Sequence, residues 1–348
     1  MWEPGRLFIY SVIATEDFDG RVRLKVDIHS HFASPEYVNE LSGLKTAPRI
    51  IVQRDGSKQL DCGEGLGYPI DNRMTSLEPR TKEMEESGID HQVLSLPLPG
   101  TDFFERDLAS NLTQIANDEL AEVSKRSGGR FSAAANVPLK YPDLALSELR
   151  RCVNELDMRM VEMFSNIAGE CVDSERFYPF YKEVERLKIP ILIHPGRPLM
   201  MENLTEYGLA GAVGYLFDTT LAILRMVYSG LFEKLPDLRV IIPHTGSTIP
   251  YLVGRIDHQY KLLNANQRKL SRLPSEYLKK IYVDTAQSLY KPATTCAFNF
   301  TPHDHILFGS DYPYVNLKQS VATVKSLELP VKKENDIFYE NARSLGII

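Results

Sequence analysis

The chain has 348 residues, of which 43% are hydrophobic and 25% charged, enough apolar material for one large α/β domain over residues 1–348. A net charge of −6, without a cluster of lysine or arginine, excludes a nucleic-acid-binding protein. No apolar run approaches the roughly 20 residues that span a bilayer, and four scattered cysteines indicate reduced thiols, so we expect a cytoplasmic protein without a membrane partner.

The first apolar run, residues 7–14, lies close to the N-terminus. It is too short to span a membrane, its only basic flank is Arg6, and it continues into the acidic stretch 16–19. We therefore predict an extra strand or a capping segment here. A secretion signal is the alternative.

Short apolar runs alternate with helix-like stretches from about residue 25 to the end of the chain. Most of the runs lack polar alternation, which is typical of strands buried on both faces of a parallel sheet. The predicted strands are 24–31, 91–96, 130–136, 159–164, 189–194, 239–243, 281–284 and 305–309. Apolar residues at helical spacing predict helices over 75–86, 111–125, 144–156, 177–187, 218–232, 248–264 and 292–298.

Eight strands, each followed by a helix, predict an α/β fold of the (β/α)8 TIM-barrel type. The competing open, doubly wound sheet normally has a glycine-rich turn after its first strand, and none is present here. Residues 34–73 interrupt the alternation, because they are too many for an ordinary connection from a strand to a helix. Since they follow the first strand on the catalytic face, we expect a lid or a small antiparallel insertion over the active site.

Several predicted strands end in side chains that bind metals. His29 and His31 are separated by one residue, so they point to the same face of the first strand. Later strands end at His194, His244 and Asp311. Because the carboxyl ends of barrel strands meet on one face, we expect these groups to converge there. Imidazole and carboxylate together suit one divalent ion, with Zn²⁺ as the first choice and Mn²⁺ as the alternative.

A single histidine at a strand end is more often a hydrogen-bonded core or turn residue than a ligand. The joint pattern favours a metal site, because unrelated structural needs would not place all these groups on one rim. Four other histidines are predicted to be structural. His91 precedes its strand, His258 lies within a helical pattern, and His303 and His305 precede the last strand.

These residues lie in sequence blocks that carry a resemblance. The blocks are Asp27-Ile-His-Ser-His31, His194-Pro, His244-Thr-Gly-Ser, Val253-Gly-Arg-Ile-Asp-His258 and Gly309-Ser-Asp-Tyr-Pro-Tyr314. In this order they resemble the amidohydrolase superfamily, and within it the decarboxylase branch. That branch is typified by aminocarboxymuconate-semialdehyde, γ-resorcylate and 5-carboxyvanillate decarboxylases. The resemblance runs from about residue 25 to the C-terminus and includes the connecting segment 230–238.

The resemblance implies a ligand set for one divalent metal. His29, His31, His194 and Asp311 would be the ligands, and His244 would stay free beside the metal as the proton-transfer group. Binuclear relatives bridge two metals through a carboxylated lysine at the end of strand four. The corresponding segment 160–165 contains no lysine, so a single metal is expected.

Other residues are assigned by the resemblance and by residue chemistry. Arg197 follows the His-Pro block where the muconate-semialdehyde enzyme has a tryptophan, and its guanidinium could clamp a carboxylate bidentately. Arg255 matches an arginine that reaches the neighbouring subunit's site, with a structural role as the alternative. Asp284 is a candidate to orient His244 or a ligand, or to cap its loop. Loose candidates for a substrate arginine after strand one are Arg49, Arg54 and Arg73.

Together these features predict a metal-dependent, non-oxidative decarboxylase of an aromatic or unsaturated carboxylic acid. The metal would bind the carboxylate as Lewis acid and template, and the proton would come from His244, from Asp311, or from a water that His244 activates. A lactonase or amidase with the same ligands is the alternative. A barrel that has lost catalysis would lack a ligand or the free histidine, and all five are present. The resemblance also implies a homodimer or homotetramer.

Overall fold

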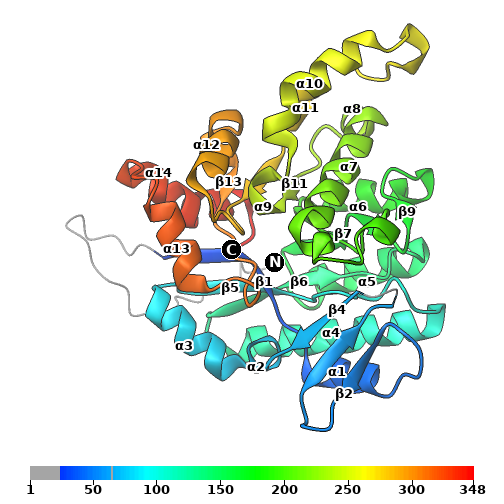
Figure 1. Cartoon of the computed structure of the whole chain (residues 1–348), viewed down its shortest axis with the longest axis vertical. Coiled ribbons are helices and arrows are strands. Elements are labelled where there is room, and N and C mark those ends of the chain that lie inside the picture. The colour runs from blue at the N-terminus through cyan, green and yellow to red at the C-terminus, as the bar shows by residue number, and fades with distance from the viewer. Residues whose placement is uncertain (1–23, 64–65) are drawn as a thin grey trace, which may run out of the picture.

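The computed structural model describes residues 24–63 and 66–348 (Figure 1). The run 7–14 and the start of the predicted domain 1–348 lie outside these residues. The main sheet has eight strands that neighbour one another in chain order. They are β1 (Val26–His31), β5 (His91–Ser95), β6 (Phe131–Asn136), β7 (Met160–Phe164), β10 (Ile191–His194), β11 (Val240–Ile242), β12 (Tyr282–Asp284) and β13 (Ile306–Leu307). All eight predicted strands are confirmed.

The first and last strands meet and close the sheet. Ile28 N donates to Phe308 O at 3.0 Å, and His31 N donates to Tyr312 O at 2.7 Å. Going around the sheet from β1 to β13, each strand pairs in parallel with the next, as crossover connections require. The TIM-barrel prediction is therefore confirmed, and the seam between β1 and β13 holds two of the predicted metal-binding segments side by side.

One apolar cluster takes a side chain from almost every barrel strand. Its members include Ile28, Val93, Ala134, Met160, Leu192, Ile241 and Leu307, with Ala342 and Leu345 of the C-terminal helix α15 (Asn341–Leu345). Such a layer fills the inside of a small barrel, so the barrel is a packed core and not a pore. Functional groups are therefore confined to the rim.

The predicted helices are confirmed around the barrel. They correspond to α2 (Asn72–Thr75) with α3 (Leu77–Ser87), α4 (Arg106–Arg126), α5 (Pro142–Asn154), α6 (Tyr178–Leu187), α7 (Tyr215–Tyr228), α10 (Ile249–Leu262) and α12 (Lys291–Phe300). Shorter elements complete the connections. They are β8 (Asn166–Ile167), β9 (Glu170–Cys171), α8 (Leu231–Lys234), α9 (Pro243–Gly246) and α11 (Pro274–Leu278). Three further helices, α13 (Leu317–Lys325), α14 (Val331–Asn335) and α15, follow β13 and lie outside the predicted helix ranges.

One helix of the described chain, Ala210–Tyr228, is long and apolar enough to cross a membrane by length and composition alone. It joins a π-helical turn to α7 and was not noted as an apolar run in the sequence. Half of it is buried inside the protein, as expected for a core helix. The other half presents apolar side chains on the surface.

The segment 34–73 forms a small unit of its own beside the barrel (Figure 1). It contains α1 (Pro35–Ser42) and a three-stranded antiparallel sheet of β2 (Arg49–Val52), β3 (Lys58–Asp61) and β4 (Gly67–Ile70). Its apolar side chains, such as Tyr37 and Leu60, share a cluster with Met201 and Ala210 from the segment after β10. The antiparallel insertion is observed, whereas its closing as a lid stays a prediction.

Candidate metal centre

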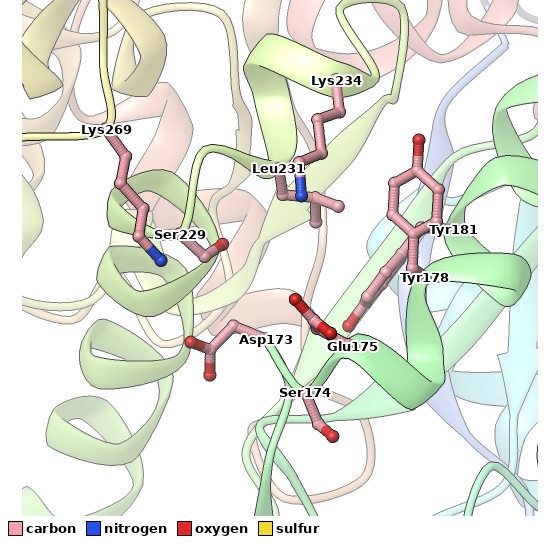
Figure 2. A pocket seen from close by; sticks show the side chains of 9 residues that line it. All are labelled: Asp173, Ser174, Glu175, Tyr178, Tyr181, Ser229, Leu231, Lys234 and Lys269. Carbon is pink, nitrogen blue, oxygen red and sulfur yellow. The ribbon is translucent and has the colours of Figure 1, made fainter.

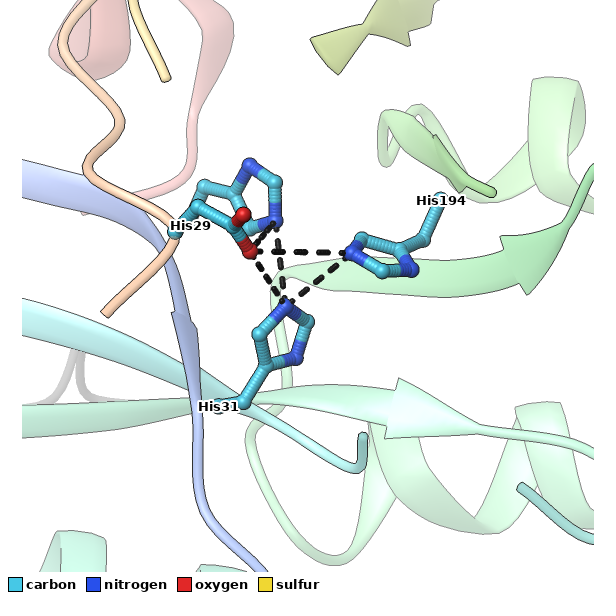
Figure 3. Close-up of side chains that lie close together, drawn as sticks. His29, His31 and His194 are labelled. Carbon is cyan, nitrogen blue, oxygen red and sulfur yellow. Dashed lines mark hydrogen bonds and ion pairs between the residues drawn. The ribbon is translucent and has the colours of Figure 1, made fainter. Parts of the chain in front are cut away.

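The four predicted ligands converge at the carboxyl ends of their strands, and Figure 3 shows the three histidines of this set turned toward one another. The Nε2 atom of His31 lies 3.2 Å from Nε2 of His29 and 3.1 Å from Nε2 of His194. It also lies 3.1 Å from Oδ1 of Asp311. All four side chains are buried. The structure thus brings together residues that are separated by up to 282 positions in the sequence.

The spacing of these atoms fits a single ion. A tetrahedral ion with bonds of about 2.0–2.2 Å keeps its ligand atoms about 3.3–3.6 Å apart. The ligand atoms here lie between 3.1 Å and 3.8 Å from one another in the pairs that involve Asp311 Oδ1 or His31 Nε2. Three nitrogens and one carboxylate oxygen at this spacing suit Zn²⁺ or Mn²⁺.

Hydrogen bonds behind the rings fix which nitrogen faces the centre. His29 Nδ1 donates to Asp284 Oδ2 at 2.6 Å, and His194 Nδ1 donates to the carbonyl oxygen of Pro195 at 3.0 Å. Their Nε2 atoms therefore turn lone pairs to the centre, a pattern typical of metal-binding histidines. Lone pairs this close repel one another unless a cation or a proton lies between them, so the donor set fits a metal.

The electrostatics prepare the same centre. Burial lowers the pKa of His31 to about 3, so its ring is neutral at neutral pH. Burial alone would raise the pKa of Asp311, but the four imidazole rings that surround its carboxylate hold it well below its usual range. Burial also acts to lower the pKa of His29. The Asp284 and Asp311 carboxylates outweigh it and raise that pKa, and a cation held at Nε2 would take the place of the proton.

His244 lies beside the cluster and is not part of it. Its ring centroid is 5.7 Å from that of His29, and its Nε2 atom lies 3.5 Å from Oδ2 of Asp311. The ring is buried, yet neither of its nitrogens has a hydrogen-bond partner among the described residues. Leaving buried polar atoms without partners costs free energy, so this histidine is poised to bond something that enters the site.

The backbone holds His244 in an unusual conformation. It has φ 56° and ψ 52° in the turn α9, and Asp311 likewise has φ 63°. Left-handed backbone is unfavourable for residues other than glycine and marks functional positions when the surroundings enforce it. Here His244 N donates to Asp284 Oδ1 at 2.9 Å, and Asp311 N donates to His29 O at 2.9 Å. Asp284 therefore contacts both the His29 ring and the His244 backbone, as predicted for a residue that orients His244 or a ligand. It also accepts from Ala286 N at 2.9 Å, so the alternative role of capping its loop is observed as well.

A close backbone approach makes this arrangement sterically feasible. A Cβ atom on Gly309 would lie 2.9 Å from the Cβ of His29 and 3.0 Å from the Cβ of Asp284. Real Cβ atoms essentially never come so close, so only glycine fits here. Gly309 therefore lets the segment that carries Asp311 pack against both β1 and β12.

Three residues next to the cluster were not identified from the sequence. Gln287 Nε2 donates to Asp311 Oδ2 at 2.6 Å. The Tyr314 ring lies 5.6 Å from the His31 ring, and Tyr68 of the insertion lies 5.9 Å from Tyr314. Burial raises the pKa of both phenols well above its usual value, so they stay neutral donors. Tyr314 was within reach of sequence reasoning because it ends the Gly309–Tyr314 block, whereas no pattern marks Gln287 or Tyr68.

The predicted arginines lie outside the ligand cluster. Arg197 is half-buried in the segment after β10 and acts electrostatically on Cys62 of the insertion, where burial raises the pKa of the thiol to about 12. Arg255 is exposed on α10. Arg49 pairs with Asp61 of the neighbouring strand. Arg54 is exposed at the turn between β2 and β3, and Arg73 pairs with Asp71.

Two features lie away from the centre. A cavity of about 310 Å³ opens on the flank, between α6, α8 and the loop that carries Lys269 (Figure 2). None of its lining residues is a predicted ligand. His91, predicted to be structural, has Nδ1 2.8 Å from Gly129 O and Nε2 2.8 Å from Ser132 Oγ, which is consistent with that role.

Comparison with known proteins identifies relatives over nearly the whole chain. A family model described as an amidohydrolase matches residues 26–345. The γ-resorcylate decarboxylase of Rhizobium radiobacter is 30% identical over 339 residues, covering 92% of this chain and 97% of the relative. The 2-amino-3-carboxymuconate-6-semialdehyde decarboxylase of Dictyostelium discoideum is 28% identical over 300 residues, covering 84% and 82%.

A solved structure with similar architecture contains a metal. It is the dihydroxybenzoic acid decarboxylase of a Polaromonas species, with bound manganese and the inhibitor 2-nitroresorcinol. It superimposes with a TM-score of 0.77 at 27% identity, and the match covers 93% of this chain and 97% of that one.

Proposed function

This chain belongs to the amidohydrolase family, and from that premise we propose that it is a metal-dependent, non-oxidative decarboxylase of an aromatic or unsaturated carboxylic acid. The observation that carries the proposal is the buried cluster of three histidines and one aspartate, with a fourth histidine, His244, whose ring nitrogens have no hydrogen-bond partner among the described residues beside it. Relatives that cover most of both chains are decarboxylases of this kind.

The reaction exchanges a carbon–carbon bond for a carbon–hydrogen bond. When bound, the divalent ion supplies Lewis acidity and a template for the carboxylate and an adjacent oxygen. A proton is delivered to the carbon that bears the carboxylate, the bond to that carboxylate breaks, and CO2 leaves with no change of oxidation state elsewhere. The chain must therefore hold one proton close to the substrate carbon.

The two carboxylate oxygens of Asp311 face different partners. Oδ1 faces the histidine ligands, at 3.1 Å from His31 Nε2, whereas Oδ2 faces His244 Nε2 at 3.5 Å and accepts from Gln287 at 2.6 Å. We assign the proton to the His244–Asp311 pair, with the His244 ring as the group that delivers it. This assignment joins two of the three proton sources predicted from the sequence; the third is a water that His244 activates.

The finer assignments rest on residue chemistry. We propose Zn²⁺ in preference to Mn²⁺ because three imidazoles and one carboxylate suit it, although the Polaromonas relative contains manganese. Arg197 is proposed to bind the substrate carboxylate, and the insertion 34–73 to close over it. A cytoplasmic location is supported by the four cysteines, which are all free thiols.

Substrate turnover tests the proposal directly. Two kinds of carboxylic acid should be tested with the metal-loaded protein: hydroxylated benzoates, such as 2,6-dihydroxybenzoate and carboxyvanillate, and unsaturated acids, such as carboxymuconate semialdehydes. Turnover should release CO2 from one of them. Lactones and amides should stay intact. Chelation should stop the release, and adding Zn²⁺ or Mn²⁺ back should restore it. Lactone or amide hydrolysis without any CO2 would instead establish the hydrolase alternative, which uses the same ligands.

We further propose that the chain forms a homodimer, or a tetramer built from such dimers. On α7 and the preceding turn, Val213, Phe217 and Leu221 recur every fourth residue and form an exposed apolar stripe. Tyr251 of the adjacent α10 is 85% exposed. Exposed apolar side chains of this kind often mark protein interfaces, and the exposed Arg255 follows Tyr251 by one helical turn on α10.

Subunit mixing tests whether Arg255 acts in the partner's site. Arg255→Ala and His29→Ala should each be inactive alone. After subunit exchange, half of the dimers pair one variant with the other, and each has one intact site, so about one quarter of the wild-type activity should return. Lys261→Ala, which removes another exposed cation of α10, should keep full activity. An active Arg255→Ala homodimer would show that this arginine is only structural.

A further inference from the structure

Three buried polar side chains form a chain behind the metal ligands of β1. Arg80 of α3 donates from Nη1 to Gln92 Oε1 at 3.0 Å, and Gln92 Nε2 donates to Asp27 Oδ2 at 2.8 Å. All three side chains have 0% exposure. A charged guanidinium and a carboxylate are costly to bury, so their placement here calls for a function that apolar residues would not provide.

The Asp27 end of the chain joins two ligand-bearing segments across the barrel seam. Its carboxylate accepts from His29 N at 3.2 Å. The same carboxylate accepts from Ser310 N at 2.9 Å and from Ser310 Oγ at 2.6 Å. One carboxylate therefore bonds the backbone of the predicted ligand His29 and that of Ser310, the residue directly before the predicted ligand Asp311.

The Arg80 end of the chain bonds the backbone of a third predicted ligand, His31. Arg80 Nη2 donates to the carbonyl oxygen of His31 and, at 3.3 Å, to that of Arg73. The guanidinium carbon lies 4.6 Å from the centre of the Tyr312 ring, the residue that follows Asp311. Arg80 therefore contacts the ligand segments of β1 and of the seam from the outer side of the barrel.

We propose that the Arg80–Gln92–Asp27 chain is a positioning device that holds the backbones of His29, His31 and Asp311 at the spacing a divalent ion requires. These residues act through the ligand backbones and do not touch the ion. Gln92 is the central link, because its amide accepts from one charged partner and donates to the other. The inference rests on the proposed metal centre and is independent of the substrate.

Breaking the central link tests the inference. Gln92→Met keeps the volume and removes both hydrogen bonds, and it should weaken Zn²⁺ and Mn²⁺ binding by about 10–100-fold, as for other partners of metal ligands. Affinity is measured by competition with a chelator, without substrate. The visible absorption of Co²⁺-loaded protein should also shift, because a displaced ligand changes the coordination geometry.

A matched control separates positioning from packing. Asn341 is another buried amide, which donates to the carbonyls of His303 and Ile306 at the opposite end of β13. Asn341→Leu should lower the free energy of unfolding as Gln92→Met does, but it should leave metal affinity and the Co²⁺ spectrum unchanged. Equal metal affinity in Gln92→Met and wild type would overturn the inference.

A double variant tests whether the residues act as one chain. The double variant Arg80→Met/Gln92→Met should bind metal about as tightly as the single variant that has the lower affinity. If the losses of metal-binding free energy in the two single variants add up fully in the double variant, the residues do not act as one chain. If Gln92→Met does not fold, Ser310→Ala is the substitute test. It removes the hydrogen bond that the Ser310 hydroxyl donates to Asp27, and it should weaken metal binding, though by a smaller factor than expected for Gln92→Met. A wild-type protein that binds no divalent ion would overturn the proposed metal centre, and the inference with it.

Discussion

Replacing Asp311 by alanine is expected to abolish both metal binding and decarboxylation. Asp311 is the one carboxylate among the four residues of the ligand cluster. Its Oδ1 atom lies 3.1 Å from His31 Nε2 and 3.4 Å from His29 Nε2. Without it, three neutral imidazoles would hold a dication with no formal charge to oppose it. Metal content should fall from about one ion per chain to near zero. The substitution removes one of the four side-chain bonds to the ion and, with it, the negative charge that balances the ion.

The measurement is metal analysis of the purified protein, which also identifies the ion, together with CO2 release. Asp102→Ala is the matched control, because Asp102 is also buried, accepts from Lys140 N at 2.9 Å, and is not a member of the ligand cluster. Because Asp102 is not one of the predicted ligands, its removal is expected to leave metal content unchanged. An Asp311→Ala protein that retains a full complement of metal would show that the ligand set is wrong.

Replacing His244 by alanine is expected to separate catalysis from metal binding. The ring is outside the ligand cluster, and its nitrogens have no partner among the described residues, so its loss should leave metal content nearly intact. The kcat should fall by about 10²–10⁴-fold, the usual effect of removing an acid–base group. The KM should change less, because the proposed carboxylate contacts are made by other residues.

His91→Ala provides a control of the same chemical type. His91 lies at the start of β5 and bonds Gly129 and Ser132, so its removal should cost stability, about 1–3 kcal/mol for lost buried hydrogen bonds, and leave kcat unchanged. Loss of metal from His244→Ala would mean that His244 is a ligand. An unchanged kcat would mean that Asp311 alone delivers the proton.

Much of the fold and part of the site could be predicted from local sequence patterns. Unbroken apolar runs such as 189–194 indicate strands buried on both faces, and eight of them alternating with amphipathic helices indicate a barrel. The strand period places His29 and His31 on one face. Barrel topology brings all carboxyl ends of strands to one rim, so His194, His244 and Asp311 could be expected beside them without any knowledge of side-chain packing.

The structure decided which of these groups form the cluster and how they are held. Asp284 bonds His29 Nδ1 and His244 N, Gln287 bonds Asp311, and the insertion brings Tyr68 close to Tyr314. The distances and partners in these pairings could not be predicted from the sequence, because each pairing joins side chains from different strands or loops that meet only in the folded barrel. Sequence periodicity reports how each segment is buried, whereas the left-handed backbone of His244 and the network around Asp27 arise from contacts between distant segments.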